Sequence, residues 1–383
     1  MEGWERVTLV DVLTATNRVE AVEPTKEYRL LGVRLEGRGP FIRETVLGTQ
    51  TSASKLFRVH AGDFIYSRLF ACRGAFGVVD VTMDGCFVSG EFPIYQAHPE
   101  RLDLQFLRYW FTLPSVISRV DEDCTGSTPL TRNRFKENFF LALKIPLPPL
   151  SEQRRIVARI EALAAEIDEA KRLRREAVGE SEALCRTILK TATEITPTPM
   201  SELVDLRPSD VTVHPDETYH FAGVYSFGRG VFPSVTKSGM EFAYPRLSRL
   251  RQGDFVYPKL MAWEGAMGVV PEDCNGLVVS TEFPVFEVNE ELVFSEVLNV
   301  YFRDPAIWPK LSGSSTGTNV RRRRLNPRDF LNHEFPLPDR ATQNTLRTVC
   351  REVDALKHLQ SETAGELDAL LPAILDRAFK AEL

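Results

Sequence analysis

The 383-residue sequence lacks the features of several common protein classes. No apolar run approaches the about 18 residues that a membrane-spanning helix needs, and the N-terminus has no basic segment followed by an apolar one. No low-complexity tract interrupts the chain, and its composition is that of a folded protein. We therefore expect a cytoplasmic protein of two or three domains with no membrane partner.

Cysteine is scarce, and its placement excludes the usual metal motifs. The six cysteines are scattered without a Cys-x-x-Cys pair: Cys72, Cys86, Cys124, Cys185, Cys274 and Cys350. Because no ligands are paired at the spacing of a zinc finger, the sequence predicts reduced, mostly buried thiols and no metal site.

Catalytic motifs are missing as well. The chain has no Gly-x-x-x-x-Gly-Lys-Ser/Thr phosphate cradle and no Asn/Asp-Pro-Pro-Tyr/Phe motif of an amino-methyltransferase. Neither Pro-Asp dipeptide is followed by an acidic-x-Lys nuclease cluster, and no histidines pair at helical i, i+4 spacing. We therefore expect a chain that is not an enzyme and binds no cofactor itself.

A general excess of positive charge is also absent. The net charge is −6, and residues 1–149 carry 18 basic and 18 acidic side chains. This balance weighs against non-specific attraction to phosphate, but a specific DNA-binding protein can keep its basic groups on one face.

What the sequence does contain is an internal repeat. The segment 62–66 (Gly-Asp-Phe-Ile-Tyr) recurs at 253–257, and 17 of the 33 positions from 62 to 94 are identical to those from 253 to 285. A repeat of this length indicates a duplicated domain rather than a solenoid unit. Short runs with strand composition, such as 28–33 and 63–68, alternate with turns, and 102–111 has the pattern of an amphipathic helix.

Each copy runs into a long helix. The prolines of 145–149 are expected to stop regular structure, with Ser151 as N-cap of a helix that reaches about Thr191. Apolar residues at 4-3-4-3 spacing predict a coiled-coil seam along a rod of roughly 60 Å: Ile156, Ile160, Leu163, Ile167 and Ala170.

The second long helix has an unbroken 3-4 seam and a proline, Pro372, that is expected to kink it near its end. Its seam positions are Leu346, Val349, Val353, Leu356, Gln360, Thr363, Leu367, Leu370 and Ile374. The alternative interpretation of each helix is a surface helix that packs on its own domain.

The sequence therefore predicts an α+β fold. Two homologous mixed α/β domains are separated by two long helices, which form an antiparallel coiled coil with an approximate two-fold relation. The predicted segments are head 1 (1–149), spacer helix 1 (150–195), head 2 (196–339) and spacer helix 2 (340–383).

Basic residues concentrate on predicted turns of both copies. Each copy has a Gly-Arg-Gly hairpin tip (37–39 and 228–230) and a Gly-Ser/Thr loop followed by arginines (126–134 and 317–324). Such loops suit phosphate contacts and guanidinium contacts to guanine edges, although solvated turns or salt-bridge partners are the alternative. The candidate DNA-binding residues are Arg38, Arg68, Arg73, Ser127, Thr128, Arg132, Arg134, Arg229, Lys237, Lys259, Thr318, Asn319, Arg321, Arg322, Arg323 and Arg324.

Taken together, these motifs resemble the specificity subunits of type I restriction–modification systems. The resemblance covers essentially the whole chain. It rests on 145–156 (Ile-Pro-Leu-Pro-Pro-Leu-Ser-Glu-Gln-Arg-Arg-Ile), on 370–379 (Leu-Leu-Pro-Ala-Ile-Leu-Asp-Arg-Ala-Phe), and on the Gly-Asp-Phe, Ser-x-Glu-Phe-Pro and Gly-Ser-Thr segments. The second elbow departs from the pattern, since 335–343 lacks the Pro-Leu-x-Glu part.

The resemblance implies that each head is a target recognition domain for one half of a split sequence in double-stranded DNA. It also implies two methyltransferase (modification) subunits, which use S-adenosylmethionine to methylate adenine, and restriction (helicase-nuclease) subunits. The partner-binding residues it suggests are Gln153, Arg154, Ile156, Ile160, Gln343 and Leu346. Two alternatives stay open: a specificity component of a type II-like or other phage-defence methylation system, and a coiled-coil protein scaffold that does not read DNA.

Overall fold

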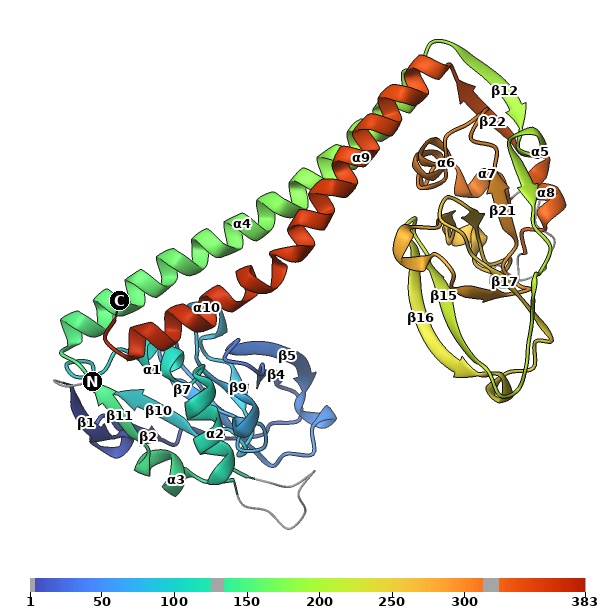
Figure 1. The fold of residues 1–383 in the computed structure, drawn as a ribbon. Coiled ribbons are helices and arrows are strands. Elements are labelled where there is room, and N and C mark those ends of the chain that lie inside the picture. Colours follow the sequence, from blue (N-terminus) through green and yellow to red (C-terminus); the bar gives the residue numbers. More distant parts are fainter. Residues whose placement is uncertain (1–3, 125–133, 313–323, 383) are drawn as a thin grey trace. The chain divides into compact units, whose positions relative to one another are not determined.

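The computed structural model describes residues 4–124, 134–312 and 324–382. The chain divides into two compact units. Unit 1 consists of residues 1–171 and 363–383, and unit 2 consists of residues 172–362. Each unit contains one head together with segments of the long helices (Figure 1).

Three small sheets build the head of unit 1. A two-stranded antiparallel sheet pairs β1 (Glu5–Thr8) with β11 (Lys144–Leu147). A four-stranded sheet has the order β2 (Leu13–Thr16), β10 (Ile94–Ala97), β7 (Phe64–Tyr66), β8 (Phe76–Val78). A five-stranded sheet has the order β3 (Val19–Ala21), β6 (Lys55–Arg58), β9 (Phe87–Val88), β4 (Glu27–Val33), β5 (Pro40–Leu47), in which β4 and β9 are parallel.

The head of unit 2 repeats this plan strand by strand. Its two-stranded sheet pairs β12 (Ile195–Pro199) with β22 (Glu334–Pro338). The four-stranded sheet has the order β13 (Val204–Leu206), β21 (Val285–Val288), β18 (Phe255–Val256), β19 (Gly268–Val269). The five-stranded sheet has the order β14 (Val211–Thr212), β17 (Arg246–Arg249), β20 (Val278–Ser280), β15 (Thr218–Tyr225), β16 (Gly230–Ser238), again with one parallel pair, β15 and β20. The predicted duplication is therefore confirmed.

Short helices complete the heads. Unit 1 has α1 (Leu104–Trp110), α2 (Pro114–Glu122), α3 (Glu137–Ala142) and the 3-10 turns η1 (Leu9–Asp11), η2 (Gly48–Gln50), η3 (Ala71–Arg73) and η4 (Val81–Met83). Unit 2 has α5 (Met200–Leu203), α6 (Ser295–Phe302), α7 (Trp308–Ser312), α8 (Pro327–Leu331) and the turns η5 (Gly239–Glu241), η6 (Ala262–Glu264) and η7 (Glu272–Cys274). The helix predicted at 102–111 is α1, which packs four of its residues into the core.

The proline segments do not stop regular structure, contrary to the prediction. Lys144–Leu147 and Glu334–Pro338 are strands, with Pro146 opposite Arg6 and Pro336 opposite Pro197. Proline is tolerated because a two-stranded sheet has two open edges, toward which every second residue directs its backbone N–H.

The first long helix, α4, spans Leu150–Lys190. The backbone N–H groups of Glu152 and Gln153 donate to the carbonyl of Pro149, at 2.8 and 3.0 Å. The helix therefore begins at Leu150, and the prediction of Ser151 as its N-cap is wrong.

The second long helix is two helices, α9 (Arg340–Glu362) and α10 (Ala364–Phe379), interrupted at Thr363. Pro372, the expected kink, lies inside α10. After the interruption the apolar positions shift: Leu370 is 45% exposed, and Leu371 packs against the core instead. The seam predicted for this region is thus interrupted at Thr363 and wrong at Leu370, whereas its position Ile374 does pack against the core.

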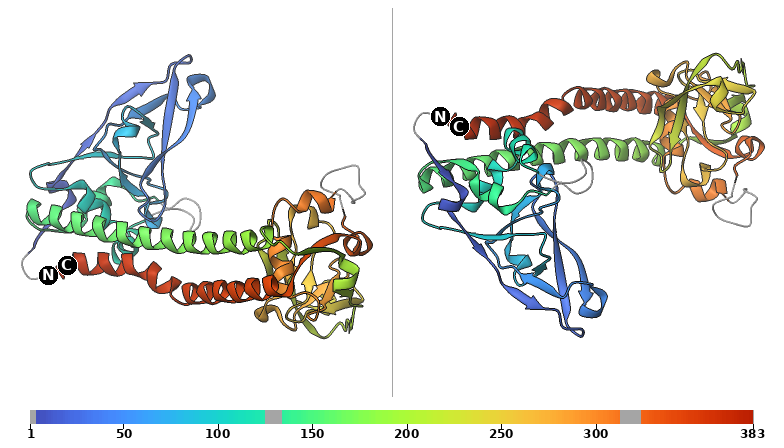
Figure 2. Two further views of the ribbon diagram at one scale, coloured as in Figure 1. Left: turned by 90° about the horizontal axis from the view of Figure 1, so that it is seen from above. Right: turned by 90° about the horizontal axis from the view of Figure 1, so that it is seen from below.

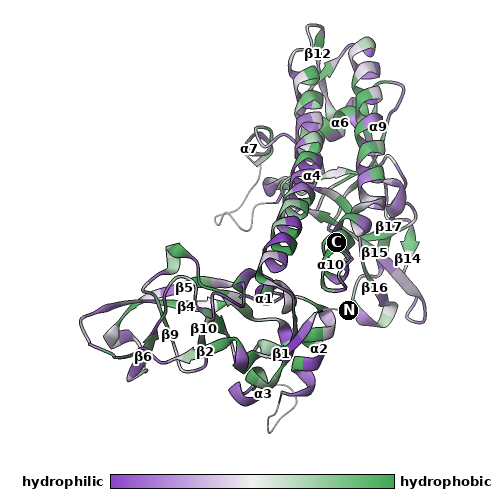
Figure 3. Ribbon diagram, turned by 90° about the vertical axis from the view of Figure 1, so that its left-hand side faces the viewer, coloured by the Kyte–Doolittle hydropathy of each residue, from purple (hydrophilic) through white to green (hydrophobic). Residues whose placement is uncertain are grey.

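Within each unit, the long helices pack antiparallel. In unit 1, Lys171 binds Asp368 at 2.5 Å, and Ile156 and Ile160 share a core with Leu375 and Phe379. In unit 2, Lys357 binds Glu182 at 2.7 Å, and Cys350 lies 3.7 Å from Cys185. Figure 2 shows α4 beside α10 in unit 1 and beside α9 in unit 2, and Figure 3 shows polar and apolar residues alternating along α4 and α9. Among the helices that the structure describes, none is long and apolar enough to cross a membrane.

Candidate nucleic-acid interface

The Gly-Arg-Gly segments form the hairpin tips that the sequence predicts. In unit 1 the tip joins β4 to β5, and Gly37 adopts a φ of 69°, which favours glycine. The tip is tied to η3, since the N–H groups of Glu36 and Gly37 donate to the carbonyls of Arg73 and Gly74 at 2.9 and 2.8 Å. The backbone therefore brings the segments that carry Arg38 and Arg73 together.

Unit 2 repeats the tip, with a change of charge beside it. The N–H groups of Phe227 and Gly228 donate to the carbonyls of Glu264 and Gly265, at 2.8 and 3.0 Å. Glu264 stands where unit 1 has Arg73. The two tips share a backbone frame but present different side chains.

The arginines at the tips are exposed. Arg38 binds Glu36 at 2.7 Å, with 70% of its side chain exposed. Arg229 stacks on the ring of Tyr225 at 4.8 Å and donates to the carbonyl of Ser226. Both remain open on one side, as a contact to nucleic acid requires. Lys237 is partly exposed on β16, away from the tip.

A second site, which we call the loop base, lies where the predicted Gly-Ser/Thr loop rejoins the head. In unit 1 it consists of Arg68, Glu91, Arg134 and Phe135. The N–H of Arg68 donates to the carbonyl of Glu91 at 3.0 Å, and the N–H of Phe135 donates to the carbonyl of Arg68 at 2.9 Å. The guanidinium of Arg134 donates two hydrogen bonds to the carboxylate of Glu91, at 2.9 and 3.0 Å.

The loop base of unit 2 has the same bonds and consists of Lys259, Glu282, Arg324 and Leu325. The N–H of Lys259 donates to the carbonyl of Glu282 at 3.0 Å, and the N–H of Leu325 donates to the carbonyl of Lys259 at 2.9 Å. Arg324 forms an ion pair with Glu282. The backbone geometry and the glutamate–arginine pair thus recur in both heads.

The cations that follow β7 and β18 are also held in place. Arg68 donates to the carbonyl of Gly90 at 2.6 Å and forms an ion pair with Glu137. Lys259 donates to the carbonyl of Thr281 at 2.9 Å. Carboxylates accompany most of these cations, so each loop base combines basic side chains with acidic partners.

Eight of the candidate DNA-binding residues lie outside the described residues. They are Ser127, Thr128 and Arg132 in unit 1, and Thr318, Asn319, Arg321, Arg322 and Arg323 in unit 2. Arg134 and Arg324 follow these segments directly, so the structure places the points where both segments return to the heads.

Each repeat has a buried tyrosine, and the one in unit 1 is hydrogen-bonded to the backbone of the loop base. Burial raises the pKa of Tyr66 far above its ordinary value, so it stays neutral. Its hydroxyl donates to the carbonyl of Phe135 at 3.3 Å. Burial also raises the pKa of the equivalent Tyr257, whose hydroxyl has no hydrogen-bond partner among the described residues.

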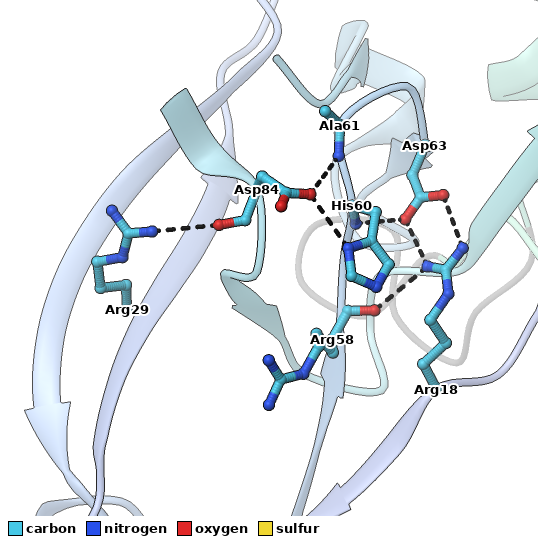
Figure 4. A network of polar contacts seen from close by, with 7 residues as sticks. All are labelled: Arg18, Arg29, Arg58, His60, Ala61, Asp63 and Asp84. Atoms are coloured by element: carbon cyan, nitrogen blue, oxygen red, sulfur yellow. Dashed lines mark hydrogen bonds and ion pairs between the residues drawn. The ribbon is translucent and has the colours of Figure 1, made fainter. Parts of the chain in front are cut away.

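The aspartate of the Gly-Asp-Phe repeat is structural. Asp63 is 1% exposed and accepts hydrogen bonds from Arg18, at 2.6 and 3.0 Å, and from the N–H of His60 at 2.7 Å (Figure 4). In unit 2, the carboxylate of Asp254 accepts hydrogen bonds from the guanidinium of Arg207 and from the N–H of Arg251. Figure 4 also shows Asp84, which accepts from the N–H of Ala61 and lies 3.1 Å from the ring of His60.

Comparison with known proteins agrees with this architecture. Residues 1–176 match the family model described as the type I restriction modification DNA specificity domain. A curated relative, the type I restriction enzyme EcoEI specificity subunit of Escherichia coli, is 24% identical over 202 residues, which are 50% of this chain and 33% of the relative. The match thus spans only about a third of that relative's length.

Two solved structures share the fold over the whole chain. The HsdS subunit of Thermoanaerobacter tengcongensis has a TM-score of 0.55 and 24% identity, with 100% of this chain and 98% of that chain covered. A chain from a study of complex assembly and conformational transition of the type I R-M system has a TM-score of 0.66 and 23% identity, with 100% and 99% covered.

Residues 1–176 are thus similar to the DNA specificity domain of type I restriction–modification systems. The family model covers head 1 and part of α4, and the internal repeat extends the same plan to head 2.

Most of the partner-binding residues predicted from the resemblance are buried within the chain itself. Ile156, Ile160 and Leu346 belong to the cores of the two units. Gln153 is fully buried: its side-chain oxygen accepts from the N–H of Asp103, and its nitrogen donates to the carbonyls of Arg101 and Pro148. These side chains pack inside this chain, and the contacts to modification subunits expected of them stay a prediction.

Gln343 makes the equivalent hydrogen bonds in unit 2. Its side-chain oxygen accepts from the N–H of Phe294, and its nitrogen donates to the carbonyls of Leu292 and Pro338. The two glutamines fix the start of each long helix to its own head. Arg154 alone among the predicted partner residues is exposed. The sequence signal for Glu91 and Glu282, which were not predicted, was their recurrence in the Ser-x-Glu-Phe-Pro repeat.

Proposed function

We propose that this chain reads a bipartite DNA target, with each head contacting one half-site. The observation that carries the proposal is the recurrence of the loop base. In both heads, a strand-end cation and a glutamate–arginine pair hold the return of an arginine-containing segment at an equivalent place. A protein that reads two separated half-sites needs two such surfaces.

The chemistry of these surfaces suits DNA. Arginine side chains bind phosphates or fork onto guanine in the major groove, and backbone amides and hydroxyl groups on loops add phosphate contacts. The glutamates keep Arg134 and Arg324 oriented and partly neutralised until phosphate or a base edge replaces the carboxylate. This exchange favours a matching site over bulk DNA.

We further propose that α4 acts as a ruler. A continuous helix of 41 residues is roughly 60 Å long. A rigid helix of this length fixes an unread spacer between half-sites that lie about one DNA turn apart, centre to centre. Because Glu264 replaces Arg73 beside the hairpin tip, we expect the two half-sites to differ.

We propose these partners because the chain resembles the specificity subunits of type I restriction–modification systems. Two modification subunits would supply S-adenosylmethionine and methylate adenine, and restriction subunits would join the complex in the cytoplasm. The described residues of this chain suggest no catalytic role for it in these reactions. Its task is to position the partners on DNA.

Modified-base sequencing tests the proposal. The chain is expressed with its cognate methyltransferase in a host that lacks adenine methylation. We expect a split motif of two short blocks with a fixed gap, methylated on both strands. A short continuous motif would mean that one head alone reads DNA. Absence of methylation despite a stable complex would favour a protein scaffold.

A further inference from the structure

Unit 1 contains a cluster of two thiols and one carboxylate that lies apart from the loop base. The side chains of Cys72, Asp121 and Cys124 meet where η3 packs against the end of α2, and their ligand atoms all lie within 4.8 Å of one another. Both cysteines are half-buried and free, and Asp121 is exposed. Nothing in the proposed DNA contacts uses these three groups.

We propose that Cys72, Asp121 and Cys124 bind a thiophilic divalent cation, with Zn²⁺ as the natural occupant. Tetrahedral zinc takes sulfur at about 2.3 Å and carboxylate oxygen at about 2.0–2.2 Å, so neighbouring ligand atoms lie about 3.8 Å apart. The ligands therefore have to close by no more than about 1 Å. Each thiol releases one proton to solvent as the cation binds, and water fills the fourth position.

The local backbone prepares this arrangement. Asp121 lies in the last turn of α2 and Cys124 follows the end of the helix, with the N–H of Cys124 donating to the carbonyl of Asp121 at 3.1 Å. This turn brings the side chains of Asp121 and Cys124 close together. Cys72 comes from η3, which ends at Gly74 in the left-handed conformation with a φ of 76°. Two elements thus present ligands toward one point.

A second cysteine pair provides an internal comparison. Cys185 and Cys350 lie 3.7 Å apart in unit 2. Among the described residues, however, the cluster at Cys72 is the only group of three potential ligands at metal-binding distances. In the repeat, Trp263 stands at the position of Cys72, so this site belongs to one head.

Cobalt titration of the full-length chain tests the proposal, with metal removed and thiols kept reduced. Co²⁺ serves as the spectroscopic probe, because thiolate coordination gives charge-transfer absorption and tetrahedral geometry gives visible d–d bands. We expect one equivalent to bind and Zn²⁺ to displace it. Cys72→Ser and Cys124→Ser should abolish the bands, and Asp121→Asn should weaken binding by at least about tenfold.

Matched variants separate the site from general effects. Asp123→Asn changes a neighbouring carboxylate that pairs with Arg119, and Cys350→Ser changes the other thiol pair. Both should leave the titration unchanged. Since Asp121 is exposed, Asp121→Asn keeps the test valid even where a cysteine variant folds poorly. Absence of thiolate bands in the unaltered chain, or bands that survive Cys72→Ser and vanish with Cys350→Ser, would overturn the proposal.

Discussion

Arg134 lies along the carboxylate of Glu91, with Nε–Oε2 and Nη2–Oε1 distances of 3.0 and 2.9 Å. About half of the arginine side chain and a third of the glutamate side chain are exposed, at 49% and 33%. Exposed ion pairs contribute only about 0–1 kcal/mol to folding. The pair therefore orients the arginine more than it stabilises the head.

Removing the negative charge of Glu91 from the loop base should strengthen binding to non-specific DNA. Because Glu91→Gln removes a negative charge beside Arg134, we expect affinity at low salt to rise about twofold to fivefold, and the discrimination between specific and random duplexes to fall. Fluorescence anisotropy of the assembled complex at two salt concentrations measures both. Glu152→Gln is the control, since Glu152 pairs with Arg155 at a similar exposure on α4. An equal rise in that variant would mean that overall charge is responsible.

Removing Asp63 should destabilise unit 1 far more than removing a surface carboxylate. Asp63→Ala leaves Arg18 and the N–H of His60 without their acceptor, and breaking a buried ion pair costs about 3–5 kcal/mol. Asp84→Ala, in which the lost side chain is 53% exposed, should cost much less. Urea denaturation of the full chain compares the two. Equal costs would contradict the structural role of the repeated aspartate.

The hydrogen bonds of the buried Gln153 and Gln343 side chains should stabilise the folded state of both units. Gln343→Leu keeps the approximate volume but leaves the N–H of Phe294 and two carbonyls unpaired, at a cost of about 2–4 kcal/mol. Gln153→Leu should cost at least as much. Gln360→Leu is the matched control, because its only described bond, to the carbonyl of Arg174, is long at 3.4 Å. Chemical denaturation that ranked Gln360→Leu as the most damaging change would refute this role.

Acid should weaken unit 2 through His333. Burial, followed by the nearby Lys310, lowers the pKa of His333 below its ordinary value of 6.5, and the ring lies 3.0 Å from the hydroxyl of Tyr301. The unfolded chain therefore binds a proton more readily. Stability is fully present above about pH 6.5 and is lost as pH falls toward the lowered folded-state pKa.

Leu143 occupies the equivalent place in unit 1, since the N–H of Leu9 donates to its carbonyl as the N–H of Met200 donates to that of His333. His333→Leu should thus reduce the loss of thermal stability between about pH 7.5 and about pH 5.5. Melting curves of the variant and the unaltered chain at both pH values check this. Identical losses would assign the acid sensitivity to other groups.

Lengthening α4 tests the ruler. Four added residues near its middle, with four added to the partner segment of α9, extend the pair by about 6 Å and rotate it by little more than one turn. We expect the preferred spacer to change while the letters of both half-sites stay the same. Methylome sequencing reports both properties. A change in the letters would show that α4 does not act as a spacer alone.

The repeat and the heptads in the sequence predicted the two heads, the hairpin tips and α4, because identical core residues and glycines require the same local structure. The β11 strand was missed, since its prolines argue against a strand unless the sheet has open edges. The interruption at Thr363 was missed because threonine is tolerated in helices. The burial of Gln153 and the meeting of Cys72 with Cys124 depend on residues distant in sequence, which no local pattern records.

The core of unit 1 is closed by α10, whose Phe379 ring packs 4.8 Å from that of Phe106, with Leu375 and Ala378 alongside. These residues are synthesised only after the whole of unit 2. Head 1 thus emerges first from the ribosome but acquires its last core side chains at the end of translation. A nascent chain leaves the groove beside Phe106 exposed until then, so folding of the first half is coupled to synthesis of the second.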